Sequence, residues 1–125
     1  MKLHLTQSAG NQLITGYGKG WIEVNETRYE RSLIVLPNLL VTDWPPSSFD
    51  LLTVEHFARL AALKPEIVLL GTGDAHHFAH PRLSHALTET GIGLECMTTE
   101  AACRTYNILM SEGRHVAAAL IIKMT

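Results

Sequence analysis

Helical and strand-like segments alternate along the second half of the chain, and this alternation constrains the fold more than any other feature. Apolar residues recur at helical spacing between residues that cap or end helices, such as Thr53 and Gly113. We expect helices over 54–63, from Pro81 until Gly91, and over 99–113, with strands over 66–70, 92–97 and 115–124. Strands joined by helices at this spacing pair in parallel through right-handed crossovers. The sequence therefore predicts βαβ units in a sheet with helices on its faces.

The first third of the chain has the pattern of β-structure. Turn signals at 18–20 and 25–27 separate three strand-like segments, at 13–18, 21–25 and 28–36, in which polar and apolar side chains alternate. These segments predict β-hairpins that extend or cap the central sheet as an additional N-terminal layer. The chain contains no linker and no internal repeat. We therefore expect one α/β domain over residues 1–125.

Composition and charge exclude several classes of partner. With 46% hydrophobic and 18% charged residues, the chain is typical of a globular protein. A net charge of −2 with scattered basic residues predicts no nucleic-acid partner. No apolar run reaches the roughly eighteen residues of a membrane span, so we expect no membrane insertion. The first twenty residues lack the pattern of a secretory signal or transit peptide, which predicts a cytoplasmic location.

Polar residues and glycines follow three predicted strands at the edge where open α/β sheets bind ligands. Residues 38–42 form a further short apolar run, and if the strands ending near Val41, Leu70 and Met97 run parallel, the loops after them converge. Glycines allow close approach of a ligand, and helix N-termini favour anions. The sequence therefore predicts a pocket for a small molecule or an anion. Its candidate residues are Asp43, Trp44, Gly71, Thr72, Gly73, Thr98 and Thr99.

The same residues also have a purely structural interpretation. The Gly-Thr-Gly motif at 71–73 is neither a dinucleotide fingerprint nor a phosphate-binding P-loop. The two glycines can serve a tight turn and a close contact between helix and sheet, and Thr98 can cap a helix. Trp44 can fold over the edge of the core. The sequence leaves both interpretations open.

Three histidines, His76, His77 and His80, crowd into the segment before Pro81. His76 and His80 are four residues apart, as in a helical metal-binding pair. Proline disfavours helical geometry at the residue before it, however, so the helix begins at Pro81 and residues 74–80 form an irregular loop. We therefore expect no metal at these histidines.

A catalytic nucleophile is not evident. Cys103 lies near a predicted helix N-terminus, which lowers the pKa of a thiol, but it shares an apolar tract with Ala101 and Ala102. An inert core position fits it better. The chain also has no GxSxG motif. We assign no catalytic residue and no cofactor, and the sequence favours a non-enzymatic domain over an enzyme without deciding between them.

Several blocks of the sequence, taken together, resemble a known family. They are GTG at 71–73, Met97-Thr98, Ala101-Ala102, RTYN at 104–107, EGR at 112–114 followed by Val116, RYERSLIVLPN at 28–38 and TDWPP at 42–46. The chain resembles a family of small uncharacterised α/β domains that includes mitochondrial respiratory complex I assembly factor three and an adipogenesis-associated cytosolic protein. The resemblance implies a mixed central sheet flanked by helices and an extra β-layer. It implies no particular activity, cofactor or catalytic residue.

Two hypotheses for function follow. The resemblance favours a protein-interaction domain, an assembly or chaperone-like factor with protein partners still to be identified. The lack of a transit pattern means that a mitochondrial role does not carry across directly. The alternative is a small-molecule or anion-binding domain, or an enzyme, that uses the predicted pocket. An exposed edge strand could also pair two copies in a homo-oligomer.

Overall fold

The computed structural model describes residues 11–123 and contains eight strands, three α-helices and one short 3₁₀-helix. In chain order the elements are β1 (Ile14–Gly18), β2 (Trp21–Val24), β3 (Thr27–Tyr29), β4 (Leu33–Leu36), β5 (Leu39–Val41), η1 (Phe49–Leu51), α2 (Val54–Ala62), β6 (Ile67–Gly71), α3 (Pro81–Glu89), β7 (Gly93–Met97), α4 (Thr99–Ser111) and β8 (Val116–Leu120). Among the described residues, no helix is long and apolar enough to cross a membrane.

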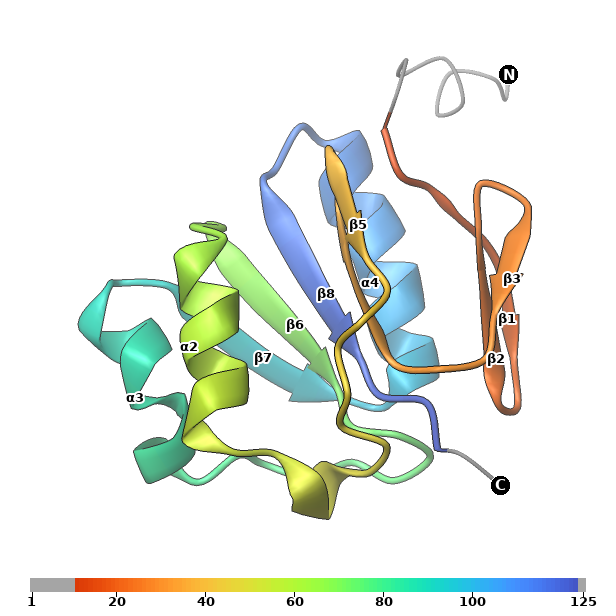
Figure 1. The fold of residues 1–125 in the computed structure, drawn as a ribbon. Helices are drawn as coiled ribbons and strands as arrows, with labels where there is room; N and C mark the ends of the chain where they lie inside the picture. The colour runs from red at the N-terminus through yellow and green to blue at the C-terminus, as the bar shows by residue number, and fades with distance from the viewer. Residues whose placement is uncertain (1–10, 124–125) are drawn as a thin grey trace.

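The central sheet has five strands in the order β5-β4-β8-β6-β7 (Figure 1). β6 pairs in parallel with both β7 and β8, and α3 and α4 form the connections between these strands. β4 pairs antiparallel with both β8 and β5. The predicted βαβ units and mixed sheet are therefore confirmed.

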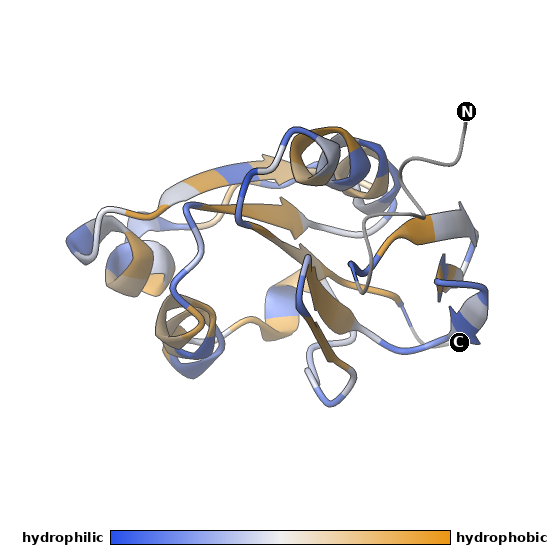
Figure 2. Cartoon of the chain, turned by 90° about the horizontal axis from the view of Figure 1, so that it is seen from above, coloured by the Kyte–Doolittle hydropathy of each residue, from blue (hydrophilic) through white to orange (hydrophobic). Residues whose placement is uncertain are grey.

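Helices cover both faces of this sheet, α4 on one side and α2 with α3 on the other (Figure 2). The central strand β8 is fully buried and supplies both cores, because successive side chains of a strand point to opposite faces. Val116, Ala118 and Leu120 face the α4 core. Ala117 and Ala119 face the core under α2 and α3. The small alanine side chains leave room for helices to pack on both sides.

Strands β1, β2 and β3 form a separate antiparallel sheet, which packs on the same core as α4. This is the additional N-terminal β-layer that the sequence predicts. The turn between β2 and β3 holds Asn25 at φ 49° and Glu26 at φ 70°, both in the left-handed region. Such a turn matches the twist of a two-residue hairpin, although glutamate adopts this backbone conformation at a cost.

The prediction of a single strand over 28–36 is wrong. The chain instead leaves one sheet after Tyr29 and enters the other at Leu33. Ser32 fixes the crossing: it is buried, and its hydroxyl oxygen accepts a hydrogen bond from the Ile122 backbone N–H at 2.8 Å. The polar–apolar alternation in fact ends at Glu30, because the polar residues 30–32 precede the apolar run 33–36, and this break coincides with the crossing.

The helices begin and end where capping residues predict. In α2, the Thr53 backbone N–H donates to Nδ1 of His56 at 3.0 Å. α3 begins at Pro81 as expected. At the start of α4, the Ala101 N–H donates to the Thr98 hydroxyl oxygen at 3.3 Å. Gly113 follows the end of α4 with φ 83°, a backbone conformation that glycine adopts without strain.

Candidate functional site

The loops after β6 and β7 converge at the start of α4, as the sequence predicts. The Thr72 N–H donates to the Met97 carbonyl at 2.8 Å, and the Thr99 N–H donates to the Gly73 carbonyl at 3.0 Å. The Thr99 hydroxyl accepts from the Gly73 N–H at 2.9 Å and donates to the Ile121 carbonyl at 2.8 Å. Thr99 therefore joins the ends of β6 and β8 to the start of α4, and its hydroxyl is already engaged.

Both glycines of the 71–73 motif are required by the backbone. A Cβ atom on Gly71 would lie 2.9 Å from the Cα of Thr99, so only glycine allows α4 to approach β6 this closely. Gly73 has φ 97°. Between them, Thr72 is 4% exposed, and its hydroxyl donates to the Ala75 carbonyl at 2.6 Å. This threonine closes the loop and directs no free hydroxyl to a ligand.

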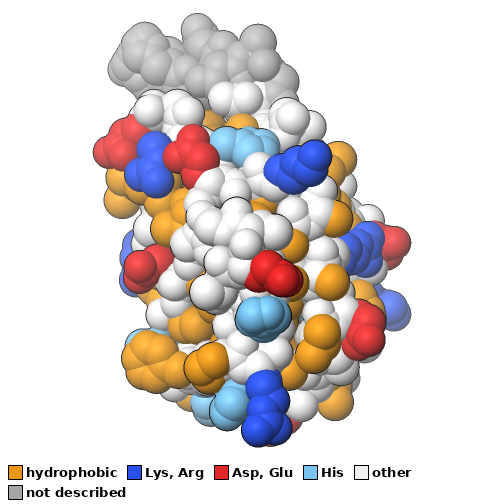
Figure 3. All heavy atoms as spheres, turned by 90° about the vertical axis from the view of Figure 1, so that its left-hand side faces the viewer, with side chains coloured by type: hydrophobic (Ala, Val, Ile, Leu, Met, Phe, Trp, Pro, Cys, Tyr) orange, Lys and Arg blue, Asp and Glu red, His pale blue; other side chains and the backbone are white. Residues whose placement is uncertain are grey.

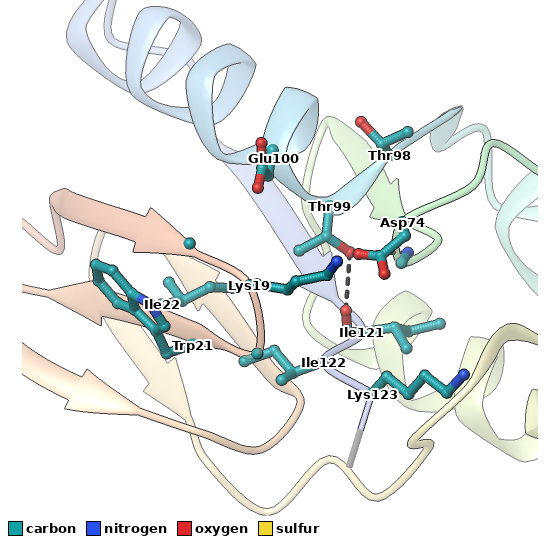
Figure 4. A pocket seen from close by; sticks show the side chains of 13 residues that line it. Lys19, Trp21, Ile22, Asp74, Thr98, Thr99, Glu100, Ile121, Ile122 and Lys123 are labelled. Carbon is teal, nitrogen blue, oxygen red and sulfur yellow. Dashed lines mark hydrogen bonds between the residues drawn. The ribbon is translucent and has the colours of Figure 1, made fainter. Parts of the chain in front are cut away.

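A pocket of about 630 Å³ lies beside this junction, which we call the edge pocket (Figure 4). Three segments form most of its wall: the β1–β2 hairpin, the start of α4 and the residues after β8. The lining comprises Gly18, Lys19, Gly20, Trp21, Ile22, Gly73, Asp74, Thr98, Thr99, Glu100, Ile121, Ile122 and Lys123. Of the predicted site residues it includes Gly73, Thr98 and Thr99. The hairpin and the residues after β8 were missed because no local pattern places them here.

The edge pocket carries mixed charge around an apolar wall. Lys19 points from the hairpin toward Thr99 and Asp74, while the amino group of Lys123 points away from Lys19 (Figure 4). Glu100 adds a second carboxylate at the N-terminal end of α4, where the helix dipole favours negative charge. Neither lysine forms an ion pair with a residue that the structure describes. The pocket can therefore offer a cationic group to an anionic ligand.

Asp43 and Trp44 do not line the edge pocket. The Asp43 carboxylate pairs with Arg59 of α2 at 2.7 Å, and the hydrogen bond from Arg59, with its charge, lowers the Asp43 pKa. Trp44 is 1% exposed and packs in the α2 and α3 core, edge-on to the His56 ring at 6.0 Å between centroids. Among the described residues, its indole N–H has no hydrogen-bond partner. The structure thus shows the folded-in aromatic of the structural interpretation.

The three histidines serve different local contacts. Nδ1 of His80 accepts the Arg82 N–H at 3.0 Å and caps α3, while the ring of His77 stacks on Phe49 with 4.6 Å between centroids. His76 lies against Phe78 at 4.4 Å. Within residues 11–123, no three His, Cys, Asp or Glu side chains are grouped so that they could hold a metal. The irregular loop predicted for 74–80 is confirmed.

The block at 104–107 has a clear structural task. Asn107 of α4 accepts the Ile14 N–H at 3.0 Å and donates to the Ile14 carbonyl at 2.7 Å. The Tyr106 hydroxyl donates to the Gln12 carbonyl at 2.7 Å, and Arg104 donates to the Tyr17 hydroxyl at 3.2 Å. This face of α4 therefore attaches the three-stranded sheet to the rest of the protein.

Cys103 of α4 is fully buried in the same core. Burial, with a smaller contribution from Glu100, raises the pKa of its thiol to about 12. Because the thiolate is the reactive form of cysteine, Cys103 is a core residue in this structure, as the sequence predicts.

These features define a class: a small α/β domain in which one helix attaches an antiparallel three-stranded layer to a mixed five-stranded sheet. The chain belongs to the family described as "Protein of unknown function (DUF498/DUF598)", whose model matches residues 14–121.

Known relatives agree with the resemblance seen in the sequence. The chain is 36% identical over 110 residues to NADH dehydrogenase [ubiquinone] 1 alpha subcomplex assembly factor 3 of Bos taurus, covering 86% of this chain and 59% of the relative. It thus spans little more than half of that protein. A crystal structure from Bordetella parapertussis has a TM-score of 0.86 at 39% identity and covers 91% of this chain and 98% of its own. A Bordetella pertussis protein described as a Mth938-like domain has a TM-score of 0.82 at 35% identity, over 98% and 92% of the two chains.

Proposed function

We propose that this chain is a non-enzymatic protein-interaction domain that acts as an assembly or chaperone-like factor. The observation that carries the proposal is its 36% identity to a protein named as an assembly factor. That relationship supports an assembly-factor role with protein partners. The engaged hydroxyls of Thr72 and Thr99 and the buried thiol of Cys103 agree with a role in binding, because none of the three is available as a nucleophile.

Exposed apolar side chains mark a surface for such contacts. Leu51, Val54 and Phe78 are 54%, 51% and 78% exposed, and we call them the apolar surface. The stacked rings of Phe49 and His77 join the segment that contains Leu51 to the loop that contains Phe78. Figure 3 shows hydrophobic side chains beside histidines at the lower end of the face that carries α3. Large apolar side chains in solvent are characteristic of protein-binding surfaces.

Cross-linking in cells tests this proposal. The tagged full chain should recover a reproducible set of proteins, and Phe78→Ser should lose them because it removes the most exposed apolar side chain of the surface. Ile108→Ser is the matched control, since Ile108 is 58% exposed on α4. Recovery of the tagged chain alone would contradict the proposal. If Phe78→Ser and Ile108→Ser recover the same proteins equally well, the apolar surface is not the binding site.

A second candidate function rests on the edge pocket. Its volume of about 630 Å³ and the lysine that points into it suit a small anionic molecule. Phosphate, nucleotides and small carboxylates can be screened by thermal shift, where a ligand that binds the native state raises the Tm by mass action. Lys19→Ala should abolish the shift, whereas Lys64→Ala, outside the pocket, should not. If no compound raises the Tm, this candidate fails.

We also propose a cytoplasmic location, which rests on the sequence alone. Fractionation of cells that express the untagged chain tests it: the protein should stay with the soluble fraction. Recovery with membranes or in a secreted fraction would contradict it.

A further inference from the structure

The outer side of β7 has no strand partner among the described residues, since β6 is its one neighbour. The Gly93 N–H donates to the Glu66 carbonyl at 3.2 Å, and the Met97 carbonyl accepts from Thr72 at 2.8 Å. Along a parallel strand, residues that bond to one neighbour alternate with residues whose N–H and C=O point the other way. Leu94 and Cys96 therefore direct both of their backbone groups away from the sheet.

The other strand edges are closed or short. The Asn107 amide binds both backbone groups of Ile14 and so occupies one end of the outer side of β1. β3 and β5 have three residues each, against five in β7. β7 is therefore the longest open edge in the described part of the chain. Such an edge is a template for a further strand.

The side chains of β7 define what such a strand must carry. Leu94 and Cys96 face the α3 side and pack with Ala79 against its core. Glu95 lies between them, faces the opposite side and is exposed. A strand added here would place one side chain beside Glu95 and its two neighbours beside Leu94 and Cys96.

We propose that β7 binds an extended segment of a partner protein as a sixth strand of the sheet. The segment carries Lys or Arg next to Glu95, flanked by apolar residues that continue the surface of Leu94 and Cys96. The backbone groups of Leu94 and Cys96 supply the hydrogen bonds, and Glu95 supplies the charge preference. This inference rests on the proposed function as an interaction domain and names the chemistry of the partner.

A second copy of this chain fits the edge less well. In a symmetric antiparallel pair that uses both Leu94 and Cys96, the centre of symmetry lies at Glu95. The two Glu95 side chains would then stand directly opposite each other, and like charges in that position are destabilising. A pair in a shifted register would instead need the backbone groups of Ile92 or Thr98. The Ile92 N–H is already bonded to α3, and the Thr98 carbonyl is already bonded to α4. Charge therefore favours a basic partner over self-pairing.

Amide hydrogen exchange on the isolated protein is the first test. The Leu94 and Cys96 amides should exchange rapidly, and those of Glu95 and Met97 slowly. A blocked peptide, Ser-Thr-Val-Lys-Val-Thr-Ser, should then slow exchange at Leu94 and Cys96 and shift their NMR signals. The same peptide with Glu in place of Lys should bind about fivefold more weakly. Slow exchange at Leu94 and Cys96 in the free protein, or no shift with millimolar peptide, would overturn the inference.

Two variants separate backbone pairing from charge. Glu95→Lys should reverse the preference between the two peptides, while Glu112→Lys, the same charge change at an exposed site after α4, should leave it unchanged. Cys96→Pro removes an outward N–H without removing a bond to β6, so it should abolish binding of both peptides. If Cys96→Pro does not fold, the comparison of Glu95→Lys with Glu112→Lys tests the inference. A preference that Glu95→Lys does not alter refutes the charge assignment.

Failure here differs from failure of the proposed function. If cross-linking recovers partners equally well from the wild-type chain and from Glu95→Lys, the edge is not their binding site, and the interaction function stands. Sedimentation that shows a dimer of the wild-type chain and a monomer for Cys96→Pro would assign the edge to a second copy and overturn the choice of partner.

Discussion

Replacing Asn107 with alanine should weaken the attachment of the three-stranded sheet to α4. The Asn107 amide makes two hydrogen bonds to Ile14, which is buried at 5% exposure. Without it, one buried N–H and one buried C=O lose their partners, at about 1–2 kcal/mol each. We therefore expect a loss of about 2–4 kcal/mol, or roughly 8–15 °C in Tm for a domain of this size.

Thermal and urea unfolding measure this loss, and two variants calibrate it. Asn107→Asp keeps an acceptor for the Ile14 N–H but sets a carboxylate against the Ile14 carbonyl, so it should be no more stable than Asn107→Ala. Tyr106→Phe removes a single bond, to the Gln12 carbonyl, and should cost about 1 kcal/mol. In Asn107→Ala, amides of β1 and β2 should lose more exchange protection than those of β6. A loss below about 1 kcal/mol, or equal loss of protection in both sheets, would refute the reasoning.

Further substitutions test other parts of the structure. Glu26→Gly should raise the free energy of unfolding, measured in urea, by about 1 kcal/mol, because glycine adopts the left-handed backbone of this position without strain. An unchanged free energy would contradict the strain at Glu26. Gly71→Ala should cost about 2–3 kcal/mol by pushing α4 from β6, and an unchanged Tm would refute that contact. Because Arg59 lowers the Asp43 pKa, their pair contributes above pH 4 and is lost as pH falls through that lowered pKa. The stability difference between wild type and Arg59→Gln should thus become smaller in acid, where the Arg59 hydrogen bond to the Asp43 carbonyl at 3.0 Å remains. A difference that grows in acid would contradict the lowered pKa. Cys103 should resist thiol reagents at pH 8 until urea unfolds the chain, and rapid labelling would contradict its burial.

Local features were predictable because local chemistry determines them. Thr98, Pro81 and Gly113 act on backbone groups within a few residues, so their positions fix where helices begin and end. The order of helices and strands in the second half then follows, and with it the parallel pairing of β6 and β7. The convergence of the 71–73 and 98–99 loops is a consequence of that pairing.

The features that were missed depend on contacts between residues far apart in sequence. Nothing near Ser32 indicates that Ile122 will bind its hydroxyl, and nothing near Lys19 indicates that α4 lies opposite. Asp43 follows a strand as expected, but Arg59 draws its carboxylate away from the predicted pocket. Asn107 is another such case, because its partner Ile14 lies 93 residues away in the sequence.

The place of β4 in the sheet affects how the chain can fold during synthesis. Leu33 of β4 pairs with Leu120 of β8, the last strand, whereas β6, β7 and β8 are near neighbours in sequence. Contacts between distant residues form slowly, because a long loop must close first. On the ribosome, β4 is therefore made early and can pair only with β5, the next strand in the chain, while its other edge has no partner until β8 emerges. The four apolar residues of β4, which are buried in the finished sheet, therefore stay partly uncovered in the nascent chain until β8 has been made.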